Sequence, residues 1–172
     1  MIELKEFVDK ALELFEVQQA DQLGQALIKA CDDTEKLEAF CKLTNNDLTY
    51  DWLQKIYQYY LADRKEKKQD YTPQSLAQLM GALTGESKKI IDICAGSGAL
   101  IIQKWVQNPD INAVALEIDE NVIPFLLFNM VVRNISCDVL QIDALTGEKP
   151  LNMWKIVKGD KFGHISNIKS AV

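Results

Sequence analysis

The sequence of 172 residues has few of the residues that build metal and disulfide sites. It contains one histidine, His164, and no Cys-x-x-Cys pair. Its four cysteines are Cys31, Cys41, Cys94 and Cys137. Structural zinc needs four closely spaced sulfur or imidazole ligands, and cytoplasmic proteins rarely form disulfides. We therefore expect no metal and four free thiols.

Long apolar runs are also missing. No stretch approaches the roughly 18 consecutive apolar residues of a membrane-spanning helix. The N-terminus, Met-Ile-Glu-Leu-Lys-Glu, lacks the basic region and apolar run of a secretory signal. We expect a cytoplasmic protein with no membrane contact. Because 48% of the residues are hydrophobic, a chain of this length can bury a core.

An excess of positive charge is absent as well. Residues 1–61 hold six Lys/Arg and twelve Asp/Glu, which gives −6, and residues 62–172 hold thirteen of each, which gives zero. A protein that binds nucleic acid unaided usually presents a basic face. If this chain meets DNA, we expect the contact to be made through a partner subunit or a local basic patch.

The first sixty residues predict helices. Apolar residues recur at helical spacing over 4–15, 23–30, 37–41 and 52–60. Asp33 or Thr34 is the candidate cap of the third helix, and Asp47 or Thr49 that of the fourth. The aromatic residues of the fourth helix either enter the core or form a docking face for a partner.

A polar run, Arg64 to Asp70, follows these helices as either a solvated linker or a phosphate-contacting patch. It marks the expected boundary between an N-terminal helical region, residues 1–68, and a second domain, residues 69–172.

In the second domain, predicted helices alternate with short apolar strands. Thr72 as N-cap and Pro73 as first helical residue open a helix. The predicted strands are 89–93, 112–118 and 138–142, and the helix at 121–134 is apolar almost all round and should be buried. This order predicts a parallel sheet with right-handed crossovers. The segments 153–157 and 162–168 predict a β-hairpin, with Gly159 at positive φ in a type II′ turn.

The strongest local signal is the segment Asp92-Ile93-Cys94-Ala95-Gly96-Ser97-Gly98, between a strand and a helix. Glycines there let the backbone approach a ligand, and the helix start offers free N–H groups. The third glycine of a dinucleotide fingerprint is replaced by Ile101, so a pyrophosphate is not indicated. The carboxylate of Asp92 suits a ligand with an ammonium or sulfonium centre.

Two further acids follow the next two strands. Glu117 can accept hydrogen bonds from ribose hydroxyls, and Asp143 from an adenine amino group. Singly, each acid could be a helix cap or turn residue. Together with the glycines, they favour a nucleoside ligand.

Four segments in this order, 69–73, 92–98, 115–119 and 141–145, resemble adenine-N6 DNA methyltransferases, and most closely the modification subunits of type I restriction-modification systems. The resemblance implies an α/β, Rossmann-like methyltransferase core with S-adenosylmethionine as cofactor. It implies that the aromatic-Thr-Pro segment packs against the methionine part, Glu117 holds the ribose and Asp143 holds the adenine amine. The implied cofactor-binding residues are Tyr71, Thr72, Pro73, Asp92, Cys94, Ala95, Gly96, Ser97, Gly98, Glu117, Ile118, Asp143 and Ala144.

The sequence departs from the family in its catalytic segment. Members carry Asn/Asp-Pro-Pro-aromatic after a fourth strand, to hold and stack the flipped base. No Pro-Pro occurs here, and Asn152 and Asn167 lack the flanking residues, so no catalytic residue is assigned. Either a partner subunit completes an enzyme, or the chain is a non-catalytic S-adenosylmethionine-binding or partner-docking module. A methyltransferase for another substrate is less favoured, because the tail is too short to build a substrate lobe.

The missing fourth strand also leaves the strand at 89–93 as a sheet edge, and such an edge invites pairing. We expect one strand of the C-terminal hairpin to pair there, or a partner chain or second copy to do so.

Overall fold

The computed structural model describes residues 3–62, 66 and 71–170. The expected boundary between residues 68 and 69, and all of the polar run 64–70 except Glu66, lie outside the described residues. The division into two domains therefore stays a prediction.

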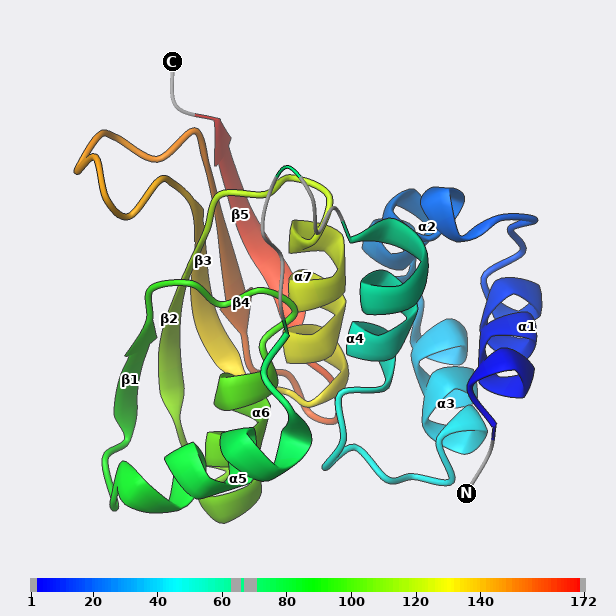
Figure 1. Ribbon diagram of the computed structural model, residues 1–172, viewed down its shortest axis with the longest axis horizontal. Helices are drawn as coiled ribbons and strands as arrows, with labels where there is room; N and C mark the ends of the chain where they lie inside the picture. The colour runs from blue at the N-terminus through cyan, green and yellow to red at the C-terminus, as the bar shows by residue number, and fades with distance from the viewer. Residues whose placement is uncertain (1–2, 63–65, 67–70, 171–172) are drawn as a thin grey trace.

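The described residues form one five-stranded sheet in the order β1-β2-β3-β4-β5. Its strands are β1 (Lys89–Asp92), β2 (Asn112–Glu117), β3 (Ser136–Gln141), β4 (Asn152–Val157) and β5 (His164–Ser170). The first three pair in parallel, whereas β4 and β5 are antiparallel. The mostly parallel start and the surrounding helices confirm the predicted Rossmann-like α/β class (Figure 1).

The helices lie on one side of the sheet in two groups, and the N-terminal group lies farther from it (Figure 1). The first group is α5 (Gln74–Leu83), α6 (Ala99–Gln107) and α7 (Ile123–Val132). The second is α1 (Leu4–Leu14), α2 (Leu23–Ala30), α3 (Thr34–Leu43) and α4 (Trp52–Ile56), with a 3-10 turn at Ala20–Gln22 and a π turn at Tyr57–Leu61. As its composition predicted, α7 is buried on all sides except at Pro124.

Both groups of helices share one hydrophobic core. The ring of Phe128 on α7 meets Phe15 and Phe40 edge-on, with centroids 5.4 and 5.0 Å apart. In the fourth predicted helix, Leu53 and Ile56 enter this core, whereas Tyr59 and Tyr60 are exposed. The first part of that segment therefore enters the core, and a docking role for the two exposed tyrosines stays a prediction.

Two helices begin later than the sequence predicted. Asp51 caps α4 by accepting from the backbone N–H of Gln54 at 3.0 Å. Asp47 instead closes a local turn with the backbone N–H of Thr49. Pro73, rather than Thr72, is the N-cap of α5, whereas Asp33 caps α3 as predicted. Polar turns before a helix offer several competing caps, and only the tertiary contacts select one.

The C-terminal hairpin forms, but its turn differs from the prediction. Gly159 does not adopt a positive φ. The connection from Val157 to His164 is too long for a two-residue type II′ turn. Glycine is needed here for a different reason, because a Cβ at this position would run into the carbonyl of Phe162.

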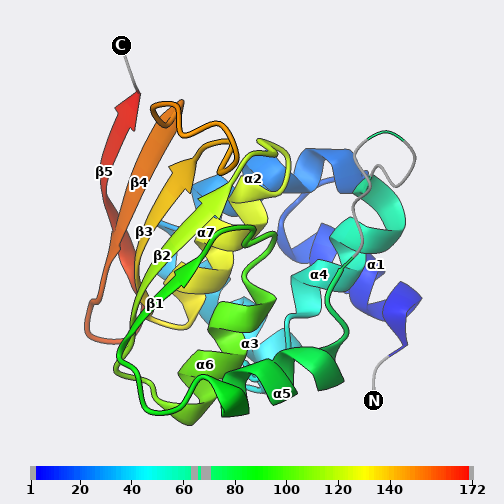
Figure 2. The same cartoon turned by 60° about the vertical axis from the view of Figure 1, so that its left-hand side comes forward.

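The hairpin also pairs at the opposite edge from the one predicted. β4 lies beside β3, with Leu151 N–H donating to the carbonyl of Gln141 at 2.8 Å. A chain leaving β3 reaches this neighbouring position through the segment 142–151, whereas the β1 edge lies two strands away. Within the described residues, no strand pairs with the outer edge of β1 (Figure 2).

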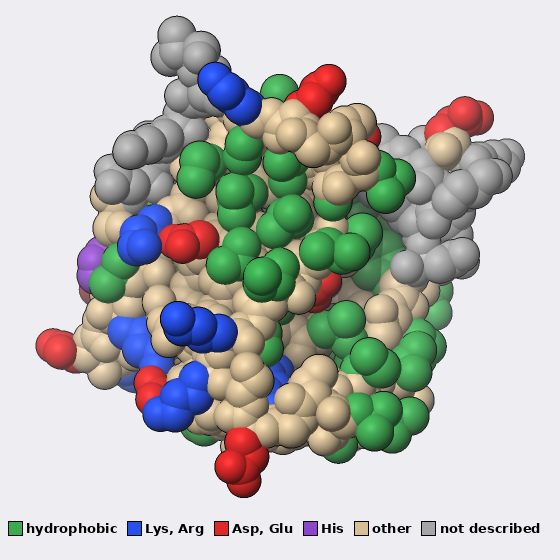
Figure 3. Space-filling model, turned by 90° about the vertical axis from the view of Figure 1, so that its left-hand side faces the viewer, with side chains coloured by type: hydrophobic (Ala, Val, Ile, Leu, Met, Phe, Trp, Pro, Cys, Tyr) green, Lys and Arg blue, Asp and Glu red, His purple; other side chains and the backbone are tan. Residues whose placement is uncertain are grey.

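The face of the sheet away from the helices is apolar and open. Ile91 is 71% exposed, and Ile93, Ile118 and Met153 are also exposed. Figure 3, which looks at this side of the molecule, shows apolar side chains gathered over it. An apolar sheet face normally packs against another layer, so this surface is a candidate interface.

The described part of the chain contains no helix long and apolar enough to cross a membrane. Over the same residues, no group of three or more His, Cys, Asp and Glu side chains is placed to hold a metal ion. Cys31, Cys41 and Cys137 are buried free thiols, and Cys94 is an exposed one.

Candidate cofactor pocket

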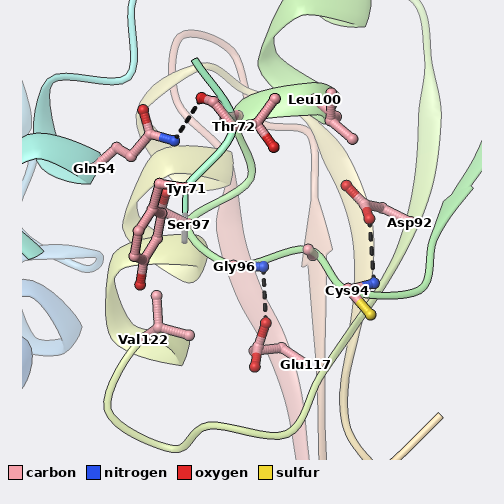
Figure 4. Close-up of a pocket in the computed structure, with 12 residues that line it drawn as sticks. Gln54, Tyr71, Thr72, Asp92, Cys94, Gly96, Ser97, Leu100, Glu117 and Val122 are labelled. Atoms are coloured by element: carbon pink, nitrogen blue, oxygen red, sulfur yellow. Dashed lines mark hydrogen bonds between the residues drawn. The ribbon is translucent and has the colours of Figure 1, made fainter. Parts of the chain in front are cut away.

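A pocket lies at the carboxyl ends of β1 and β2, which is where open parallel sheets bind ligands (Figure 4). The residues that line it are Gln54, Tyr71, Thr72, Asp92, Cys94, Ala95, Gly96, Ser97, Ala99, Leu100, Glu117 and Val122. Three segments predicted to act together, the Tyr-Thr segment, the glycine loop and the acid after β2, are thus brought together.

The glycine loop makes a tight turn from β1 into α6. Gly96 and Gly98 have φ values of 54° and 96°, a region that favours glycine. A Cβ on Gly98 would lie 2.8 Å from Met130 Cε and 3.0 Å from Leu126 Cδ1. Gly98 is therefore required for packing against α7, while Gly96 faces the pocket near the ring of Tyr71.

Glu117 holds the turn that follows β2 and also faces the pocket. One carboxylate oxygen, Oε1, accepts from the N–H groups of Ile118 and Asp119 at 2.9 and 2.8 Å. The other, Oε2, accepts from Gly96 N–H at 2.8 Å. A carboxylate oxygen has two lone pairs, so these contacts leave one acceptor site on Oε2 for a ligand hydroxyl.

Asp92 is the last residue of β1, and only one of its two carboxylate oxygens accepts a hydrogen bond from a described residue. Oδ1 accepts from Cys94 N–H at 3.3 Å, whereas Oδ2 is buried and has no hydrogen-bond partner among the described residues. Burial raises the pKa of this carboxyl, and the nearby charge of Glu117 raises it further. Leaving a buried acceptor unpaired costs about 1–3 kcal/mol, which a positively charged ligand group would offset.

The aromatic-Thr-Pro segment forms another wall of the pocket. The carbonyl of Thr72 accepts from Gln54 Nε2 at 3.2 Å, as Figure 4 shows. The ring of Tyr71 lies 5.8 Å from that of Tyr57, and burial raises the pKa of its phenol, so the hydroxyl stays neutral. A neutral aromatic ring beside a glycine loop suits the apolar stem of an amino acid.

Five residues of the predicted set do not line this pocket: Pro73, Gly98, Ile118, Asp143 and Ala144. Asp143 Oδ1 accepts from Leu145 N–H at 2.9 Å in a local turn, and Ile118 is 56% exposed. The segment of Asp143 is nonetheless tied to β2, because Ile142 N–H donates to the carbonyl of Glu117 at 3.0 Å.

Four lining residues were not predicted: Gln54, Ala99, Leu100 and Val122. Gln54 and Lys55 are both polar residues between the apolar Leu53 and Ile56, so the sequence alone does not single out Gln54. Gln54 is 8% exposed, and a polar side chain at a buried position usually has a specific partner.

Comparison with known proteins shows what this chain is similar to. A solved structure from Listeria monocytogenes, described as a class I S-adenosylmethionine-dependent methyltransferase, aligns with a TM-score of 0.54 at 14% identity. The alignment covers 84% of this chain and 55% of that one, so this chain spans little more than half of its length. No curated protein matches. The model of the N-6 DNA methylase family matches residues 48–158, and the chain therefore belongs to that family.

Proposed function

We propose that this chain binds S-adenosylmethionine in the pocket at the ends of β1 and β2, as the cofactor-binding part of an N-6 DNA methylase. The observation that carries the proposal is the unpaired buried oxygen of Asp92, beside a glycine loop and an acid with a spare acceptor. Family membership and the methyltransferase fold support the choice of cofactor.

Each wall of the pocket has a role in this proposal. The Asp92 carboxylate attracts the positively charged end of the cofactor, and Oε2 of Glu117 accepts from a ribose hydroxyl. Tyr71 packs against the methionine part. Asp143 and Ala144 lie beyond the lining, and we propose that they meet the adenine at the rim. When bound, the cofactor supplies an electrophilic methyl group.

We further propose that another polypeptide supplies the residues that hold the target adenine. The sequence contains no Asn/Asp-Pro-Pro-aromatic segment, which the family uses for that purpose. The edge of β1 that no described strand pairs with lies directly beside the pocket, since Asp92 ends that strand. A strand added there in parallel would bring its carboxyl end to the cofactor.

An exposed apolar face of the sheet supports such a partner. Ile91, Ile93, Ile118 and Met153 are exposed on this side of the molecule. An exposed apolar patch of this kind marks an interaction surface. The alternative function, a non-catalytic S-adenosylmethionine-binding or partner-docking module, uses the same surface without base chemistry.

Calorimetric titration with S-adenosylmethionine and S-adenosylhomocysteine tests the cofactor proposal. We expect micromolar binding that is lost in Asp92→Ala and Glu117→Ala. Glu120→Ala is the matched control, because this exposed acid lies close to Glu117 in sequence but outside the pocket lining. A folded protein that binds neither ligand would contradict the proposal.

A second assay separates the enzyme from the non-catalytic module. Tritium-labelled S-adenosylmethionine is incubated with adenine-containing DNA and the purified chain. We expect no transfer by the chain alone, and transfer would refute completion by a partner. A role in restriction-modification and a cytoplasmic location stay predictions.

A further inference from the structure

One short helical segment contacts three separate segments of the cofactor pocket. Asp51, Gln54 and Tyr57 follow one another at a spacing of three residues, from the N-cap of α4 to the first residue of the π turn. Their partners are Ser97 of the glycine loop, Thr72 of the aromatic-Thr-Pro segment and Asp119 beyond β2.

The contact of Asp51 fixes the glycine loop. Its Oδ2 accepts from Ser97 Oγ at 2.6 Å, and its Oδ1 accepts from Asn129 Nδ2 at 3.0 Å. Asn129 Nδ2 also donates to the Ser97 carbonyl at 2.9 Å, and Arg133 Nη1 donates to Asn129 Oδ1 at 2.8 Å. Ser97 is thus held by both its side chain and its backbone. All four side chains are buried, so solvent does not compete for these bonds.

Tyr57 acts through Asp119 on Glu117, the acid assigned to the ribose. The Tyr57 ring is 1% exposed, and its hydroxyl donates to Asp119 Oδ2 at 2.9 Å. Asp119 N–H in turn donates to Glu117 Oε1 at 2.8 Å. A shift of Asp119 would therefore turn the Glu117 carboxylate away from the pocket.

The contact of Gln54 holds the third wall. Gln54 Nε2 donates to the carbonyl of Thr72 at 3.2 Å, and the side chain also lines the pocket (Figure 4). Its backbone N–H is bound by the Asp51 carboxylate, so the two contacts depend on the same helical turn.

We propose that Asp51, Gln54 and Tyr57 are positioning residues that set the affinity of the pocket for S-adenosylmethionine, each through one segment of its wall. The inference rests on the proposed function. This role makes the N-terminal helical region part of the cofactor site, because the helical segment 51–57 packs in the core with α1 and contacts all three walls of the pocket.

Variants that delete single polar contacts test the proposal. Tyr57→Phe removes the hydroxyl and keeps the ring, which packs 5.1 Å from Phe125. Without this bond Asp119 no longer holds the Glu117 carboxylate in place, so we expect binding to weaken about tenfold, which corresponds to about 1.4 kcal/mol. Because Tyr57 acts through the ribose acid, S-adenosylmethionine and 5′-methylthioadenosine should weaken alike. Tyr59→Phe is the matched control, since Tyr59 is 66% exposed in the same turn.

Gln54→Met should give a different pattern. It loosens only the segment assigned to the methionine part, so S-adenosylmethionine should weaken severalfold while 5′-methylthioadenosine changes less than twofold. A purely structural role would lower the unfolding midpoint in urea without this discrimination between ligands. Affinities are therefore measured where each variant is fully folded.

The outcomes separate this inference from the proposed function. If the wild-type protein does not bind S-adenosylmethionine, both fail. If the wild-type protein binds and both variants bind equally well, the positioning role alone is overturned. It is also overturned if both variants weaken the two ligands to the same extent.

Discussion

Replacing Gly98 with alanine tests how the glycine loop is packed. The new Cβ would lie 2.8 Å from Met130 Cε and 3.0 Å from Leu126 Cδ1. Both side chains are fully buried, so neither can swing into solvent to make room. The residue also has a φ of 96°, which an L side chain rarely adopts.

The two effects have separable magnitudes. Left-handed backbone costs a non-glycine residue about 1–2 kcal/mol. Forcing an extra methyl group into a packed core costs about 1–3 kcal/mol. Gly98→Ala should therefore lower the free energy of unfolding by about 2–5 kcal/mol, which corresponds to roughly 2–4 °C of melting temperature per kcal/mol for a chain of this size.

Gly147→Ala is the matched control. Gly147 has a φ of 68°, but no atom lies within 4 Å of its hypothetical Cβ. Gly147→Ala should therefore lower the free energy of unfolding only by the cost of the left-handed backbone, about 1–2 kcal/mol. Urea unfolding of the two variants measures the difference directly. If Gly98→Ala is no less stable than Gly147→Ala, the packing of the loop against α7 is not as described.

Three further predictions concern the pocket and the open face. Burial raises the pKa of Asp92, so on acidification the affinity for S-adenosylmethionine should begin to fall at a higher pH than an ordinary carboxyl would give. Asp92→Asn should bind weakly in calorimetry, and its affinity should no longer show this pH dependence. Iodoacetamide should modify one thiol rapidly, that of Cys94, because the other three are buried and burial raises the pKa of Cys31 to about 12. Mass spectrometry should show that the cofactor protects Cys94, and equal labelling with and without it would place the ligand elsewhere. Ile91→Lys, on the open face of the sheet, should reduce any self-association seen by sedimentation and leave cofactor binding unchanged, because Ile91 does not line the pocket; unchanged self-association would show that this face is not the interface.

The sequence determined the features that depend on local pattern. The apolar runs of β1 to β3 and the all-round apolar character of α7 were readable because burial leaves a direct trace in composition. The glycine loop was readable because few residues tolerate positive φ at two nearby positions. These features indicated the fold class and the position of the pocket, whereas the family came from the resemblance carried by the ordered segments 69–73, 92–98, 115–119 and 141–145.

Tertiary structure alone decided how distant segments meet. The bonds from the segment 51–57 to the pocket span 46 residues from Asp51 to Ser97 and 62 from Tyr57 to Asp119, and no local pattern encodes such partners. The same holds for the choice of cap in α4 and α5, and for the hairpin, which took the edge beside β3 and left β1 without a second partner among the described strands. Periodicity fixes which face of an element is buried, but the free energy of the whole packed arrangement selects its neighbour.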